Sequence, residues 1–445
     1  MPSISVKLNE EQQILCDKVL KDKKNVFFTG CAGTGKSLTL KYIIDQLRVR
    51  YPEPNNVAVT ASTGKAAFNI SGTTLHSFAG IGLGKGTKQE LATNAQFNKN
   101  AAERWRKVKT LIIDEISMID GELFDKLEYI ARQVRKDNRR FGGIQLVLVG
   151  DLLQLPPVNE QNYIKKRIIE AECWKQCIDE YILLKHVFRQ QDISFVRVLT
   201  CIRVGAITEE VIKFMDKLQQ DKDFGGESGP VELYAIRNKT EKYNKVKLDA
   251  IESESKIYHA KDKYRRGGHQ SSSRLLESCQ APPILELKVG AQVMLVKNLN
   301  RELVNGTVGI VTNFTKPIEG KESSTDTDFS TESIPIVRFD LANGRTFTRP
   351  IKRDLWEAVL PNGEVQASRK QIPLILAWAI TIHKSQGQTI QKLRADVTDV
   401  FESGQLYTAL SRAVSPDTLQ VIGFNRDKVK VDEISLKFCL DNELI

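Results

Sequence analysis

The stretch NVFFTGCAGTGKSLTL (25–40) joins a short apolar run to an amphipathic segment through a glycine-rich turn. Its centre, GCAGTGKS (30–37), matches the phosphate-binding pattern G-x-x-x-x-G-K-[ST]. The apolar run before it and the helical pattern after it supply the strand and helix that this pattern requires. Backbone N–H groups in such a turn surround phosphate oxygens, so the stretch predicts a site for ATP.

The residues of this turn have separate expected roles. Lys36 would contact the β- and γ-phosphates, and Ser37 would offer its hydroxyl to Mg²⁺. Cys31 is expected to be a small filler rather than a redox site. The remaining nucleotide-binding residues expected here let the backbone curl around the phosphates: Gly30, Gly33, Thr34 and Gly35.

Three further apolar runs repeat the alternation of strand and helix: NVAVTAS (56–62), TLIIDE (110–115) and IQLVLVGD (144–151). Continuous runs rich in Val and Ile suit parallel strands that are buried on both faces. Helical patterns such as 121–136 lie between them. Residues 1–195 are therefore predicted to form a doubly wound α/β domain.

Polar residues at two of these strand ends complete the expected ATP site. Asp114 ends the apolar run Leu111–Ile113 and can hold Mg²⁺, while Glu115 can polarise the attacking water. Gln154, in VGDLLQLPPV (149–158), can sense the γ-phosphate from the carboxyl edge of the sheet. Taken alone, either segment would read as an ordinary helix start or polar loop.

Two arginines are expected to reach the γ-phosphate and to stabilise negative charge in the transition state. Arg189 lies in KHVFRQ (185–190), and Arg412 lies in YTALSRA (407–413). An arbitrary arginine usually forms a surface salt bridge, so this expectation depends on the surrounding motifs.

Three turns are expected to hold nucleic acid. The end of one strand and the start of the next helix, in VTASTGKAAFNI (59–70), offer hydroxyls and free N–H groups to a phosphate: Thr60, Ser62, Thr63 and Gly64. In the next loop His76 would accompany Phe78, whose ring could stack on a base, although core packing is at least as well favoured for both. TIHKSQGQT (381–389) would hold the same strand through His383 and Ser385.

Composition narrows the function classes. The 445 residues carry a net charge of +10, which suits a polyanion partner or a merely basic enzyme equally well. No apolar run is long enough to span a membrane, and the first residues lack a secretory signal core, so no membrane partner is expected. The basic segment ARQVRKDNRR (131–140) reads as a solvated face more readily than as a DNA contact.

Two stretches of the chain differ in composition and predicted secondary structure from the α/β pattern around them. The Gly- and Lys-rich stretch 80–107 reads as a small surface insertion, and 285–366 holds short β runs separated by Asn-Gly and Gly turns, which predict a small antiparallel barrel. The polar stretches 261–274 and 320–333 are expected to be loops, the second of them flexible. Helical and α/β patterns occupy 196–284 and 367–445.

Together, these motifs resemble the PIF family of superfamily-one DNA helicases, and the resemblance covers about residues 8 to 430. It includes, besides the motifs above, these segments in order: LNEEQ (8–12), LKVGAQVMLVKNL (287–299), LVNGTVGIV (303–311) and GQLYTALSRA (404–413). The resemblance implies two RecA-like domains, at 1–195 and at 196–284 with 367–445. The barrel would be an SH3-like insert and the 80–107 segment a wedge insertion.

The resemblance also implies a function. Gln12 would read the adenine edge, and Gly387 would join the nucleotide site. The chain would be an ATP- and Mg²⁺-dependent helicase that moves 5′ to 3′ on single-stranded DNA. It would unwind forked duplexes, G-quadruplexes and DNA–RNA hybrids in replication, repair, recombination and telomere maintenance, as a monomer in the nucleus or the mitochondrion. An ATP-driven translocase that mainly displaces bound proteins and a non-enzymatic nucleotide-binding module are the alternatives.

Overall fold

The computed structural model describes nearly the whole chain, in these ranges: 8–157, 164–225, 227–264, 276, 279–300, 302–315, 332–341, 345–359 and 365–445. The loop expected at 320–333 lies outside the described residues except for its last two positions. In the loop expected at 261–274, Lys261–Tyr264 instead forms strand β9, and 265–274 lies outside the described residues.

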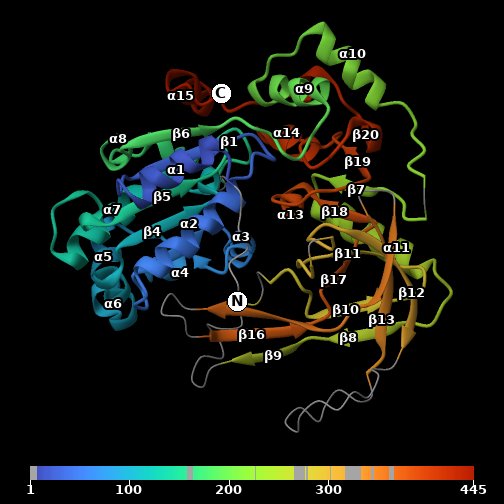
Figure 1. The fold of residues 1–445 in the computed structure, drawn as a ribbon, viewed down its shortest axis with the longest axis horizontal. Coiled ribbons are helices and arrows are strands. Elements are labelled where there is room, and N and C mark those ends of the chain that lie inside the picture. Colours follow the sequence, from blue (N-terminus) through green and yellow to red (C-terminus); the bar gives the residue numbers. More distant parts are fainter. Residues whose placement is uncertain are drawn as a thin grey trace.

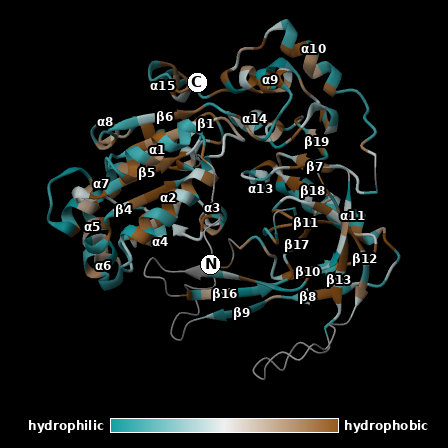
Figure 2. Ribbon diagram, in the orientation of Figure 1, coloured by the Kyte–Doolittle hydropathy of each residue, from teal (hydrophilic) through white to brown (hydrophobic). Residues whose placement is uncertain are grey.

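The first domain is built on a six-stranded sheet in the order β3-β2-β4-β5-β1-β6, and all neighbouring strands are parallel. The predicted apolar runs form its centre, and β1, for example, is buried along its whole length. Figure 2 shows the hydrophobic character of these strands. The strands of this sheet are β1 (Val26–Gly30), β2 (Val57–Ala61), β3 (Thr73–Thr74), β4 (Thr110–Asp114), β5 (Gln145–Val149) and β6 (Glu180–Leu184).

Helices cover this sheet, and Figure 1 shows α1 and α7 beside its strands. The predicted helix at 121–136 is confirmed as α7, which begins after the N-cap Asp120 and buries one face in the core. The helices of this part are α1 (Glu10–Leu20), α2 (Lys36–Arg50), α3 (Gly64–Asn69), α4 (Leu75–Ala79), α5 (Lys88–Phe97), α6 (Lys99–Lys107), α7 (Gly121–Arg135) and α8 (Trp174–Cys177).

The segment predicted as a surface insertion at 80–107 contains α5 and α6. Its apolar residues belong to the main core of the first domain, in which Leu91, Ala95 and Trp105 are buried. The indole N–H of Trp105 donates to the carbonyl oxygen of Ala79 at 3.2 Å. The two helices are thus packed into the domain, although their outer faces are exposed.

The second domain contains a four-stranded parallel sheet in the order β18-β7-β19-β20. Its strands are β7 (Val231–Tyr234), β18 (Ala379–Thr381), β19 (Leu393–Asp396) and β20 (Leu419–Ile422). The helices that follow in this part of the chain are α9 (Ile193–Val204), α10 (Glu209–Leu218), α11 (Arg237–Asp249), α13 (Ile382–Ser385), α14 (Gln405–Leu410) and α15 (Glu433–Asp441). Two parallel-sheet domains therefore confirm the predicted α/β class.

The C-terminal helix α15 departs from the predicted range of the second domain. Its Cys439 is buried in the core of the first domain, and the ring of Phe438 contacts Trp174 and Tyr181 at centroid distances of 6.2 and 5.5 Å. Asp432, just before α15, accepts a hydrogen bond from Arg167 at 2.7 Å. The end of the range 367–445 thus packs on the first domain, because its apolar face matches that core.

The β-rich region is wider than the predicted 285–366. A five-stranded sheet runs in the order β14-β13-β12-β11-β17, and the region also contains a two-stranded sheet, β10-β8, and a three-stranded sheet, β15-β16-β9. In Figure 2 β9 and β16 are largely hydrophilic. The strands are β8 (Lys256–His259), β9 (Lys261–Tyr264), β10 (Ile284–Leu287), β11 (Gln292–Leu295), β12 (Val308–Thr315), β13 (Ile334–Asp340), β14 (Thr346–Pro350), β15 (Asp354–Val359), β16 (Val365–Gln371) and β17 (Leu374–Leu376).

One buried ion pair ties the two domains together. Asp151, just after β5, contacts the guanidinium of Arg203 on α9 at 2.8 Å, and both side chains are 1 % exposed. Burial opposes ionisation of Asp151, but Arg203 and Lys36 outweigh it and hold the pKa of this carboxyl below its ordinary value. Asp151 also accepts a hydrogen bond from Gln154 at 3.1 Å, so the pair lies beside the predicted site.

Replacing Arg203 with Ala should destabilise the protein by about 3–5 kcal/mol at neutral pH, because a buried carboxylate loses its cation. The pKa of Asp151 is below its unfolded value, near 4, so the pair stabilises the fold above that pH. The contribution of the pair should therefore persist down to about pH 4 and be lost as the pH falls further, through the lowered pKa of Asp151. Denaturant unfolding at several pH values measures it.

The control is Arg197→Ala on the same helix, since the one ion pair of Arg197 among the described residues is an exposed contact with Glu210. This variant should unfold like the parent. Equal stability of parent and Arg203→Ala at neutral pH would contradict the structural role of the pair.

Candidate active site and nucleic-acid interface

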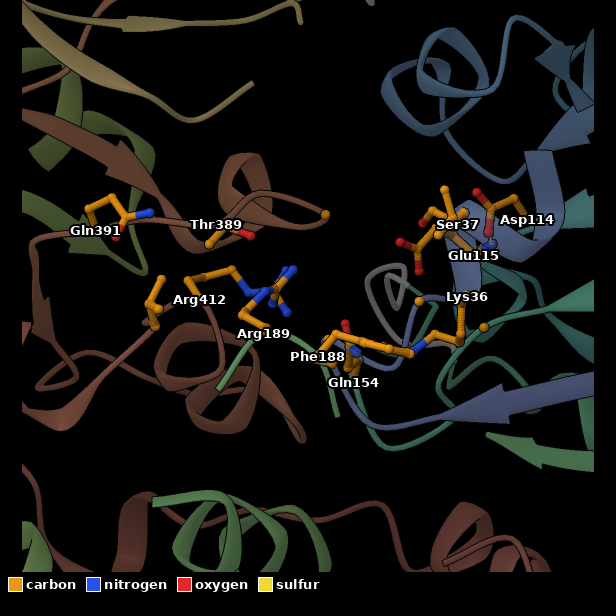
Figure 3. A pocket seen from close by; sticks show the side chains of 17 residues that line it. Lys36, Ser37, Asp114, Glu115, Gln154, Phe188, Arg189, Thr389, Gln391 and Arg412 are labelled. Atoms are coloured by element: carbon orange, nitrogen blue, oxygen red, sulfur yellow. Dashed lines mark hydrogen bonds between the residues drawn. The ribbon is translucent and has the colours of Figure 1, made fainter. Parts of the chain in front are cut away.

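A pocket of about 480 Å³ lies between the two domains at the carboxyl ends of β1 and β4. The structure brings together in its lining most of the predicted ATP-site residues: Gly33, Gly35, Lys36, Ser37, Asp114, Glu115, Gln154, Arg189, Gly387 and Arg412. Figure 3 shows Arg189 and Arg412 side by side, across the pocket from Ser37, Asp114 and Glu115. Gly30 and Thr34 are in the same turn but do not line the pocket.

The turn needs glycine at two of its predicted positions. Gly33 has φ +92°, and a Cβ there would lie 2.6 Å from the Cβ of Arg189. Gly35 has φ +81°, and a Cβ there would lie 2.8 Å from Nε2 of Gln12. Both positions combine a left-handed backbone with close neighbours, so only glycine fits without strain.

Gln12 is held against this turn by the cap of α1. Its backbone N–H donates to Oδ1 of Asn9 at 2.9 Å, and its Oε1 accepts from the N–H of Asn9 at 3.1 Å. Its Nε2 is buried and has no hydrogen-bond partner among the described residues. A buried donor without a partner is costly, and an adenine edge beside Gly35 would satisfy it. Gln12 therefore fits the predicted base-reading role.

Three cations face the pocket. The ammonium of Lys36 donates to the carbonyl oxygens of Gly30 and Cys31 at 2.7 and 2.9 Å, and burial lowers its pKa. Burial and the charge of Arg412 lower the pKa of Arg189 to about 9. Burial also lowers the pKa of Arg412 itself. An anion with several charges would relieve this crowding, since opposite charge favours each ionised form.

The arginines are fixed by the backbone of the second domain. Arg189 donates to the carbonyl oxygen of Ser411 at 2.8 Å. Arg412, only 2 % exposed, donates to the carbonyl oxygen of Thr408 and to Oγ of Ser411, both at 2.8 Å. The position of Arg412 therefore follows any movement of α14 relative to the first domain, whereas the backbone of Arg189 lies against Gly33 of the phosphate-binding turn.

The two carboxylates are also in an unfavourable environment. Burial and the neighbouring Glu115 raise the pKa of Asp114 to about 8, and burial raises the pKa of Glu115. Glu115 has φ 53° and ψ 50°, a left-handed conformation that is strained for a residue with a side chain. Its Oε2 accepts from Nε2 of Gln386 in the second domain at 3.0 Å.

The donor set at this point fits Mg²⁺. Asp114 and Ser37 line the same pocket, and a carboxylate with a hydroxyl is the protein share of a magnesium site that substrate phosphates complete. Within the described ranges, no group of three or more His, Cys, Asp or Glu residues could hold a metal by itself. The residues present are thus those expected when the nucleotide supplies the other ligands.

The side chains of three predicted DNA contacts are buried, so the structure does not favour direct contact of these side chains with DNA. Thr60 is 0 % exposed and its hydroxyl donates to Ile112 O at 2.6 Å. Phe78 is 0 % exposed and packs on Trp105 at a centroid distance of 4.9 Å, so its core-packing alternative holds. Ser385 is 0 % exposed and its hydroxyl donates within α13, to Ile382 O at 2.7 Å.

The other predicted DNA contacts lie at turns that are partly exposed, although the hydroxyl of Ser62 is itself buried. Ser62 and His76 line a second pocket of about 340 Å³, and burial lowers the pKa of His76. The hydroxyl of Ser62 has no partner among the described residues. Thr63 and Gly64 form the start of α3, with Thr63 as its N-cap. In the second domain Nε2 of His383 lies 3.4 Å from Glu402.

Sequence reasoning missed three polar residues at the domain boundary. Gln386, which lies within the motif 381–389, donates a hydrogen bond to Glu115. Lys65 donates to the carbonyl oxygen of Lys384, and burial with the charge of Arg412 lowers its pKa to about 7. The hydroxyl of Tyr407 accepts from the N–H of Ala32 at 2.9 Å. Each lies in a quoted motif, but only the fold reveals its partner.

Two parallel-sheet domains that share one phosphate-binding pocket define a two-domain P-loop protein of the RecA-like kind. Residues 7–213 match the model of PIF1-like helicases, and 272–314 match that of the 2B domain of DNA helicase Pif1. An ATP-dependent DNA helicase PIF1 from Emericella nidulans is 41% identical over an alignment of 461 positions, which covers 96% of this chain and 62% of that protein.

Two solved structures agree with this match. Bacteroides Pif1 in complex with ADP-AlF4 has a TM-score of 0.79 and 31% identity, over 99% of this chain and 98% of that one. Bacteroides Pif1 bound to single-stranded DNA has a TM-score of 0.63 and 30% identity over the same shares. The chain therefore belongs to the PIF1-like helicase family. It spans about three fifths of the length of the Emericella relative.

Replacing Phe78 with Ala should cost about 3–5 kcal/mol of stability, because a buried ring is lost beside Trp105. Phe78→Leu should cost less and remain folded. The affinity of folded Phe78→Leu for single-stranded DNA, measured by fluorescence anisotropy, should equal that of the parent. A selective loss of DNA affinity at unchanged stability would restore the base-stacking role.

Proposed function

We propose that this chain is an ATP-dependent DNA helicase that moves along single-stranded DNA and separates duplexes. The observation that carries the proposal is the composition of the 480 Å³ pocket. Its lining joins the P-loop residue Lys36 and the acidic residue Glu115 of the first domain to Arg412 of the second. Such a site is complete only while the domains are close, so hydrolysis in it can drive domain movement.

The residues divide the chemistry between them. Lys36 and the turn amides bind the phosphates, and Ser37 and Asp114 would hold Mg²⁺, which neutralises phosphate charge when bound. Glu115 orients and polarises the attacking water. Arg189 and Arg412 stabilise the charge that develops on the γ-phosphate, a contribution worth several kcal/mol.

Hydrolysis is proposed to change the grip on DNA through the Glu115–Gln386 contact. Gln386 lies between His383 and Gly387, in the turn expected to bind the strand from the second domain. The charge lost from the nucleotide after hydrolysis would weaken the attraction between the domains. The turns around Ser62 to Gly64 and around 383–389 would then separate and close again, one step along the strand in each cycle.

The relatives support a change in domain arrangement with DNA. The fit of this chain is closer to Bacteroides Pif1 with ADP-AlF4, at TM-score 0.79, than to Bacteroides Pif1 bound to single-stranded DNA, at 0.63. The two have nearly the same identity to this chain, so sequence divergence does not account for the difference.

Further properties complete the proposal. The chain moves 5′ to 3′, acts as a monomer, and unwinds forked duplexes, G-quadruplexes and DNA–RNA hybrids in genome maintenance. The nucleus is its proposed location, with the mitochondrion as a second one. Among the described residues, none of the helices has the length and apolar content needed to cross a membrane. The 80–107 segment acts as a wedge, and the β-rich region as an SH3-like insert.

Two other functions are distinguishable by simple assays. A translocase that mainly displaces proteins would remove streptavidin from a biotinylated strand but would separate duplexes poorly. A non-enzymatic nucleotide-binding module would release no phosphate when single-stranded DNA is added. The strained Glu115 and the two arginines are features that mere binding does not need.

Replacing Lys36 with Ala should abolish ATP hydrolysis and unwinding, because the β- and γ-phosphates lose their cation. Binding of single-stranded DNA should persist in part, since the DNA turns are untouched. Phosphate release and strand separation measure the first effect, and anisotropy measures the second. Full unwinding by the variant would refute the assignment of the P-loop.

A duplex with a 5′ single-stranded tail should be unwound, and a duplex with a 3′ tail should not. The reason is that the two DNA turns would hold the strand in one polarity only. A strand-displacement assay with matched tails and the same duplex tests this. Preference for the 3′ tail would overturn the proposed direction.

A further inference from the structure

A basic pocket of about 570 Å³ lies at the opposite edge of the first sheet from the nucleotide pocket. It collects the residues before the central strands: Asn25 before β1, Lys109 before β4, Gln145 at the start of β5 and Asp179 before β6. Amino and carboxyl ends of parallel strands lie at opposite edges, and strands of five residues place the two pockets roughly 16 Å apart.

Cations dominate its lining. The basic residues there are Lys23, Lys109, Arg135, Arg139 and Arg140, whereas Asp179 is the one carboxylate in the lining as described. Arg140 pairs with Asp179 at 2.5 Å, and Arg139 pairs with Asp137 at 2.6 Å. For Lys23 and Lys109, which are exposed, no carboxylate partner exists within the described part of the chain. Positive charge is therefore left over at this edge.

The pocket has a rigid floor that keeps these cations together. Arg135 donates to the carbonyl oxygens of Trp105, Val108 and Gly142, at 2.7, 2.9 and 2.6 Å. Burial, together with the charge of Arg139, lowers its pKa. A Cβ at Gly143, where φ is +76°, would lie 2.6 Å from Nη2 of Arg139, so the bare backbone there makes room for the guanidinium.

The lining suits a phosphate backbone better than a base. Tyr51 is its one aromatic residue as described, and Lys109 lies over that ring at 4.9 Å, so the ring face is covered. Ammonium groups on flexible stems bind phosphates without reading a base. A long polyanion already held at the nucleic-acid turns on the other edge would have a high effective concentration here.

We propose that this basic pocket binds the phosphodiester backbone of a DNA segment outside the path between the two domains. The inference rests on the proposed function, because that function brings DNA to this domain. The segment is either the far end of the single strand or the duplex arm, and both present the same phosphates. The predicted solvated face at 131–140 thereby supplies Arg139 and Arg140 to a binding surface.

The test compares charge reversal at Lys23 and Lys109 with a matched reversal elsewhere. The variant is Lys23→Glu with Lys109→Glu, and the control is Lys213→Glu with Lys217→Glu, two exposed lysines on α10 of the second domain. Lys23→Gln with Lys109→Gln removes the charge without reversing it. Thermal melting establishes that all of them fold.

Three DNAs separate the possible sources of phosphate. The first is a single strand of about 8 nucleotides, which is long enough only for the path between the two domains. The second is a long single strand, and the third is the short strand joined to a duplex arm. Fluorescence anisotropy at several KCl concentrations gives the affinity and its salt dependence. The Lys23/Lys109 variants should bind the short strand normally. On the long strand or on the duplex-armed strand their log–log salt slope should fall by about 2, one for each lost phosphate contact.

A lower affinity and salt slope of the Lys23/Lys109 variants on the long strand assign the pocket to single-stranded DNA. The same decrease on the duplex-armed strand assigns it to the duplex. Equal loss on all three DNAs, or an equal loss in the α10 control, overturns the proposal. Unchanged DNA binding with lost binding of poly-glutamate overturns it in favour of an acidic protein partner. ATP hydrolysis stimulated by the short strand is the check on the proposed function: its absence in the parent would count against that function alone.

Discussion

The structure as a whole depends on the burial of three cationic and two carboxyl side chains in one pocket between the two domains. Lys36, Arg189 and Arg412 face one pocket, and burial lowers the pKa of each. Asp114 and Glu115 face the same pocket, and burial raises the pKa of both. Charged groups in this state favour their ionised forms only when a counter-charge is near. In the proposed function a triphosphate with Mg²⁺ would supply both signs at once, so its binding would be coupled to closure of the domains.

The same pocket explains why the surrounding contacts are polar. The Asp151–Arg203 pair fixes α9 beside the phosphate-binding turn, while Gln386 joins the second domain to the Glu115 carboxylate. These contacts are directional, and the Asp151–Arg203 pair is fully buried. The C-terminal helix α15 packs on the first domain through Phe438, and so links the chain end back to the domain that holds the nucleotide.

The sequence predicted those elements of the fold that depend only on residues close together in the chain. The P-loop, the buried strands and α7 follow from runs of neighbouring residues, so their positions could be read before the fold was known. Phe78 could not be placed in this way, because its burial depends on Trp105, which lies far along the chain. The same holds for the partner of Arg203 and for the return of α15 to the first domain. Hydroxyls such as those of Thr60 and Ser385 look like ligands in sequence but are used by the backbone.

The central claim is that the second domain completes the catalytic site by placing Arg412 at the γ-phosphate. The most direct measurement is the single-turnover rate of ATP hydrolysis by Arg412→Ala with single-stranded DNA present, together with the affinity for a non-hydrolysable ATP analogue. We expect the rate to fall by about 10³-fold or more while the affinity changes far less, because an arginine of this kind acts mainly in the transition state. An unchanged hydrolysis rate in the folded variant would contradict the claim.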